Sequence, residues 1–222
     1  MKKKEKVLGV ISIVLVLVIV LFLVWQWNNI SALMTSMSKT EEQIAKELDI
    51  SKKQLEDELA DKYGSLISDF TADEEKQIIK GKLSVDEAVS KLNKKYEETK
   101  KNANNLSAVD ELIGDKVIEL YSLKAYYLGQ LGQMEATVKR EYLELPKEKK
   151  NVIGKTEIVE RHMGTAMSLL SQCDTQVSEL LSELERDLKK SDADTSIIKT
   201  IRDAYEKEKA LKKAYYLKLM EG

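Results

Sequence analysis

The sequence has few of the residues that form disulfides, metal sites or tight turns. Its 222 residues include one cysteine, one histidine, one proline and nine glycines. A lone cysteine cannot form a disulfide within the chain, so the fold must be stabilised by packing. His162 and Cys173 lie about 16 Å apart along one predicted helix, too far apart for a nucleophile and its base. We therefore expect no metal, no cofactor and no catalytic activity.

An excess of either charge is lacking as well. The chain has 36 basic and 38 acidic residues, which are interspersed and give a net charge of -2. Proteins that bind nucleic acids use an excess of basic side chains to displace the counterions around the phosphates. This chain has no such excess, so we expect no nucleic-acid partner. Scarce proline and glycine, with abundant lysine, glutamate, leucine and alanine, favour helices over sheets. The predicted fold class is all-α.

One apolar run is long enough to cross a membrane. Residues 7–25 contain no charge and would span roughly 30 Å as a helix, which is the thickness of a bilayer's hydrocarbon core. Lysines precede this run and none follows it until Lys39, which predicts a cytoplasmic N-terminus. The residues expected at the membrane surfaces are Lys2, Lys3, Lys4, Lys6, Trp25 and Trp27.

These features predict a single-pass signal anchor over residues 7–27, after a cytoplasmic tail of residues 1–6. A cleaved secretory signal is the alternative, although the run is longer than the usual signal core and no A-x-A site follows. The predicted location is the cell membrane, with the bulk of the chain extracytoplasmic.

Helix starts are marked by a hydroxyl residue followed three positions later by an acid or amide, the spacing of a capping box. The pairs are Thr40 with Gln43, Ser51 with Gln54, Thr71 with Glu74, Ser84 with Glu87, and Ser107 with Asp110. Gly64 and Gly81 are candidate helix stops. A region of short helices is therefore predicted over residues 28–102, with helices at 40–49, 51–63, 71–80 and 84–101.

Residues 42–55, EQIAKELDISKKQL, resemble a helix-turn-helix motif. Ala45 matches the small residue of the first helix, Ile50 the apolar turn residue and Leu55 the anchor of the second helix. The resemblance implies DNA recognition, but the second helix carries acidic side chains that would repel phosphates. They are Glu56, Asp57, Glu58 and Asp61. We therefore interpret the segment as two short helices joined by a tight turn.

Beyond Ser107 the apolar residues recur at spacings of three and four in three long segments. The first reaches about Glu144 and ends at Pro146, the second follows Asn151, and the third follows a break at 191–195. An antiparallel three-helix bundle or coiled coil is predicted over residues 103–222. Gly129 and Gly132 should allow a neighbouring helix to approach closely.

A five-residue repeat, KAYYL, occurs at 124–128 and 213–217. In an up-down-up bundle the first and third helices run parallel, which would place both copies at nearly the same height. The candidate ligand patch is Tyr126, Tyr127, Tyr215 and Tyr216. Ordinary core and boundary packing of these rings is the alternative interpretation.

The third helix is the shortest, which leaves the far end of the first two exposed. Exposed apolar strips usually mark interfaces. The candidate partner-binding residues are Tyr142, Leu145, Val152, Ile153 and Ile158. The short helices, a second copy or another protein could cover them.

The sequence thus predicts a membrane-anchored, extracytoplasmic helical interaction or scaffold protein that binds a protein partner or itself. The alternative is an extracytoplasmic ligand-binding or sensor domain that uses the tyrosines.

Overall fold

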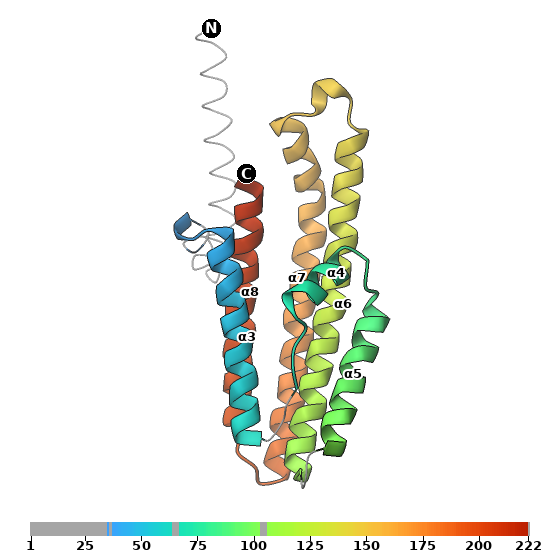
Figure 1. Ribbon diagram of the computed structural model, residues 1–222. Helices are drawn as coiled ribbons and strands as arrows, with labels where there is room; N and C mark the ends of the chain where they lie inside the picture. Colours follow the sequence, from blue (N-terminus) through green and yellow to red (C-terminus); the bar gives the residue numbers. More distant parts are fainter. Residues whose placement is uncertain (1–34, 36, 64–66, 103–105, 222) are drawn as a thin grey trace. The chain divides into compact units, whose positions relative to one another are not determined.

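The computed structural model describes residues 35, 37–63, 67–102 and 106–221 (Figure 1). That part of the chain is helical and contains no strand, which confirms the all-α prediction. The predicted anchor at 7–27 lies outside the described residues, together with the lysines and tryptophans that flank it. Among the residues that are described, no helix has the length and apolarity needed to cross a membrane.

The long helices begin and end close to where the apolar pattern predicts. The elements are α3 (Glu41–Tyr63), α4 (Ala72–Ile79), α5 (Val85–Asn102), α6 (Ala108–Glu144), a 3-10 helix η2 (Lys147–Lys149), α7 (Val152–Lys190) and α8 (Ser196–Glu221). They divide into two compact units. The first unit comprises Met1–Gln54 and Ile201–Gly222, and the second comprises Leu55–Thr200. The domain bounds at 28–102 and 103–222 stay predictions.

Four of the five predicted capping boxes are present. At α4, the Thr71 hydroxyl accepts from the amide of Glu74, whose carboxylate accepts from the Thr71 amide. The same reciprocal hydrogen bonds form between Ser107 and Asp110 at the start of α6. Thr40 with Gln43 and Ser84 with Glu87 also form them. Each box satisfies amides that have no partner inside the helix.

The fifth box is wrong, and so is the turn predicted between residues 49 and 51. Helix α3 runs unbroken from Glu41 to Tyr63, and Ser51 is buried within it. Neither glycine nor proline interrupts this stretch, so nothing in the backbone prevents the helix from continuing. The segment that resembles a helix-turn-helix is therefore part of one helix.

Where the structure describes them, several helix ends have the residue types that usually begin or end a helix. Gly81 has φ +64° just after α4, a conformation that glycine adopts without steric cost. Helix α6 stops at Glu144, ahead of Pro146, which has no backbone amide to continue the ladder. Asn151 starts α7, and its side chain accepts from the amides of Ile153 and Gly154.

In the second unit, α6 and α7 form an antiparallel hairpin, and α4 and α5 pack on α6 (Figure 1). Gly132 lies directly against the backbone of Ile79 in α4, and Gly129 lies against Val85. The prediction of a close helix approach at these glycines is confirmed. Near the start of the hairpin, the Tyr96 ring fills the space beside Gly114. The most deeply buried apolar residues include Ile113, Val117, Ala125, Leu181, Leu184, Leu188 and Ile197.

The first unit has a small core of its own. Ile44, Leu211 and Ala214 are buried together, with Leu48 and Tyr215 packed against them. This cluster joins the N-terminal part of α3 to the C-terminal part of α8.

Candidate interaction surface at the end of the hairpin

The outer half of the α6–α7 hairpin is less buried than the half beside α4 and α5. Gly132 is the last buried residue of α6, and no described side chain of α7 between Ile158 and Val177 is buried. Eight apolar side chains from the two helices and the end of α6 are partly buried in this stretch. We call them the outer seam: Met134, Val138, Tyr142, Leu145, Met163, Met167, Leu169 and Leu170. Incompletely buried apolar side chains that gather on one part of a surface often mark an interface.

The structure sorts the predicted partner-binding residues into three groups. Tyr142 and Leu145 are partly buried members of the outer seam, and Ile153 is 52 % exposed. Ile158 is only 1 % exposed, so it belongs to the core between the helices and cannot offer a contact surface. The side chain of Val152 lies outside the described residues.

The loop that joins α6 to α7 is closely packed. The Lys150 ammonium donates to the backbone carbonyl of Leu143 at 2.7 Å, which satisfies an acceptor in the last turn of α6. Gly154 has no room for a Cβ, because the carbonyl of Lys149 and the side chain of Leu145 fill that space. The connection between the two helices therefore has a defined shape.

An ion pair and a histidine bridge the two helices just inside this loop. The Glu141 carboxylate accepts from Arg161 Nη2 at 2.8 Å and lies 2.9 Å from His162 Nε2. The hydrogen bonds from Arg161 and His162 hold the pKa of the Glu141 carboxyl below its usual range. His162 is partly buried, as expected for a boundary residue, and has a structural partner.

The structure describes the side chains of three of the four tyrosines in the candidate ligand patch. Tyr126 is 46 % exposed and meets Tyr127 edge to face, with the ring centroids 5.2 Å apart. The Tyr127 hydroxyl donates to Gln176 Oε1 at 2.9 Å. Tyr215 packs in the core of the first unit, and the side chain of Tyr216 lies outside the described residues. That the four tyrosines together form a candidate ligand patch stays a prediction.

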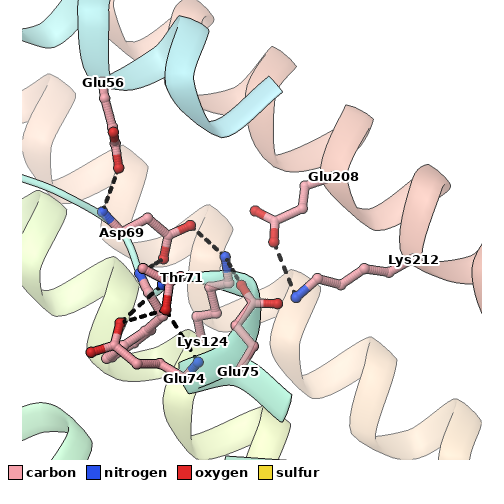
Figure 2. Close-up of polar contacts among 9 residues, drawn as sticks. Glu56, Asp69, Thr71, Glu74, Glu75, Lys124, Glu208 and Lys212 are labelled. Carbon is pink, nitrogen blue, oxygen red and sulfur yellow. Dashed lines mark hydrogen bonds and ion pairs between the residues drawn. The ribbon is translucent and has the colours of Figure 1, made fainter. Parts of the chain in front are cut away.

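A buried ion cluster was missed by sequence reasoning. Lys124 Nζ lies 2.5 Å from Asp69 Oδ2 and 2.7 Å from Glu75 Oε1. Figure 2 shows the contacts of this lysine. All three side chains are at least 86 % buried. The Asp69 amide also donates to Glu56 Oε1 at 2.7 Å. The cluster fixes the start of α4 on the middle of α6. Lys124 lies 55 residues from Asp69 and 49 from Glu75 in the sequence, so no local pattern brings the lysine to the two acids.

A shallow cavity of about 320 Å³ lies between α5 and the segment before α4. Its lining is Ile67, Ser68, Leu92, Lys95, Tyr96, Glu98, Thr99 and Asn102. This volume is at the lower end of the range for small-molecule sites. None of the tyrosines of the predicted patch contributes to it.

Comparisons of the chain with models of protein families, with curated proteins and with solved structures found no match. The interpretation of its function therefore depends on the residues of the chain itself.

Proposed function

We propose that this chain is a membrane-anchored, extracytoplasmic helical interaction protein that has no catalytic activity. It binds a protein partner, or a second copy of itself, through the outer seam of the α6–α7 hairpin. The observation that carries this proposal is the change in burial along one hairpin. The half beside α4 and α5 has a closed core, whereas the outer half presents partly buried apolar side chains from both helices.

The membrane assignment is supported by the sequence. The uncharged run at 7–25, the preceding lysines and the tryptophans at 25 and 27 suit an anchor with a cytoplasmic N-terminus. We further propose that α6, α7 and α8 form the antiparallel three-helix bundle predicted from the apolar pattern.

Charge placed in the outer seam tests the interaction. Tyr142→Asp removes apolar contact area at a partly buried position, so self-association or recovery of a cross-linked partner should fall at least tenfold. The matched control is Tyr126→Asp, which makes the same change at an exposed position on α6. Both variants should keep the helical circular-dichroism spectrum. Association that survives in the Tyr142 variant would rule out the outer seam as the interface.

A second candidate function is a ligand-binding or sensor domain that uses the tyrosines. The specific observation in its favour is the exposed Tyr126 ring, held edge to face by Tyr127, which is in turn fixed by Gln176. Aromatic faces of this kind can pack on apolar or cationic ligands. A small molecule that raises the melting temperature of the wild type, but not of Tyr126→Ala, would favour this alternative.

A further inference from the structure

Two of the most exposed large apolar side chains of the described residues flank one loop. Leu143 is 60 % exposed in the last turn of α6, and Ile153 is 52 % exposed in the first turn of α7. Between them lie three exposed lysines, Lys147, Lys149 and Lys150, and two exposed acidic residues, Glu144 and Glu148. We call residues 143–153 the hairpin end.

The positive charge of the hairpin end differs from the charge of the unit that carries it. Leu55–Thr200 has 22 basic and 29 acidic residues, whereas the hairpin end has three lysines and two glutamates. The hairpin end thus has a small basic excess, with its three lysines grouped at residues 147–150, on a unit that is acidic as a whole. Its electrostatic complement is an anionic surface.

The shape of the hairpin end is fixed by contacts that do not use the side chains of Leu143 and Ile153. The missing side chain at Gly154 lets the Lys149 carbonyl pack against α7, and Asn151 caps that helix. Lys150 holds the end of α6 through the Leu143 carbonyl. The loop therefore presents Leu143 and Ile153 to solvent without needing them for its own packing.

We propose that the hairpin end docks onto an anionic phospholipid surface, which goes beyond the protein-binding role of the outer seam. Leu143 and Ile153 would enter the region between headgroups and acyl chains, while the lysines contact lipid phosphates. The hairpin end is the turn of a helical hairpin and carries aliphatic side chains beside lysines, which is the chemistry of peripheral membrane contact. Protein interfaces are instead enriched in aromatic residues and arginine and depleted in lysine.

Vesicle capture tests this proposal. The full chain, kept in solution by phosphatidylcholine nanodiscs and held on beads by a C-terminal tag, is mixed with fluorescent vesicles. One set of vesicles contains phosphatidylcholine alone and the other also contains phosphatidylglycerol. Each lysine near an anionic surface contributes about fivefold in affinity, so Lys147→Glu with Lys149→Glu should lower capture of the anionic vesicles by about 25-fold or more. Leu143→Ser with Ile153→Ser should also lower it.

The matched control is Lys80→Glu with Lys82→Glu. These two lysines are exposed, lie two residues apart and follow α4, away from the hairpin end. The proposal requires capture of anionic vesicles by the wild type and by this control, and its loss in both hairpin-end variants. Failure of the wild type to capture them, or equal capture by the hairpin-end variants, overturns it. Capture of soluble polyglutamate in place of vesicles, lost with Lys147 and Lys149, would overturn it in favour of an acidic protein.

Discussion

The backbone carbonyl of Ile79, in the last residue of α4, occupies the space that a side chain at Gly132 would need. Only a residue without a Cβ allows α4 to lie this close to α6. Because the Ile79 contact is with backbone, it cannot be relieved by a change of rotamer. Gly132 therefore sets how closely α4 approaches α6.

Replacing this glycine should loosen α4. Gly132→Ala forces the two helices apart, and we expect a loss of about 1–3 kcal/mol in the free energy of unfolding. Gly164→Ala is the control, because Gly164 is also helical and has no atom within 4 Å of the added Cβ. That variant should gain about 0.5–1 kcal/mol from helix propensity. Urea denaturation of the two variants measures both effects, and equal stabilisation would contradict the contact with Ile79.

Removing the buried lysine should be more damaging. Lys124→Met leaves the Asp69 and Glu75 carboxylates together in a buried site without their ammonium partner, and we expect a loss of about 3–5 kcal/mol. Adding Asp69→Asn and Glu75→Gln removes the two buried negative charges, so the triple variant should recover part of the lost free energy of unfolding. Thermal unfolding followed by circular dichroism compares them. A triple variant less stable than Lys124→Met would show that charge repulsion is not the cause.

Tyr96 should make stability fall at alkaline pH. Burial and the hydrogen bond to Asp115, at 2.9 Å, raise the pKa of the Tyr96 hydroxyl well above its ordinary value. A raised folded-state pKa gives stability that is fully present below the unfolded pKa of about 10 and is lost as the pH rises further. The stability advantage of the wild type over Tyr96→Phe should therefore shrink above about pH 10. An advantage that stays constant to higher pH would contradict this.

Two serines with the same local sequence signal should respond differently to alanine. Ser107 accepts from the Asp110 amide at 3.1 Å, so Ser107→Ala should cost about 1 kcal/mol. Ser51 lies inside continuous α3, so Ser51→Ala should cost nothing or stabilise the chain slightly. Equal losses at the two positions, measured by chemical denaturation, would show that a helix begins at Ser51 after all.

The sequence predicts the helical class and most helix boundaries because these depend on neighbouring residues. The apolar pattern of the helix that ends before Pro146 depends only on residue spacing. The capping boxes at Thr71 and Ser107 depend only on hydrogen bonds between residues three positions apart. The same local rule fails at Ser51, since spacing alone does not distinguish a hydroxyl at a helix start from one buried inside a helix.

Features that depend on distant residues were not predictable. The ion cluster of Lys124 joins residues from the segment before α4, from α4 itself and from α6. Burial of Ile158 depends on the facing helix, so periodicity places it on the apolar stripe without showing that it is inaccessible. Leu143 and Gly154 lie close to the predicted partner-binding residues, but their importance follows only from the packing of the loop.

The most direct test of the central proposal is the topology of the chain in intact cells. A single reporter cysteine is introduced by Lys190→Cys together with Cys173→Ser, because Lys190 is an exposed side chain at the end of α7. A membrane-impermeant thiol reagent should label it before lysis, whereas Lys3→Cys in the same background should react only after lysis. Labelling of residue 190 in intact cells is the predicted result. Labelling only after lysis would place the hairpin in the cytoplasm and contradict an extracytoplasmic interaction protein.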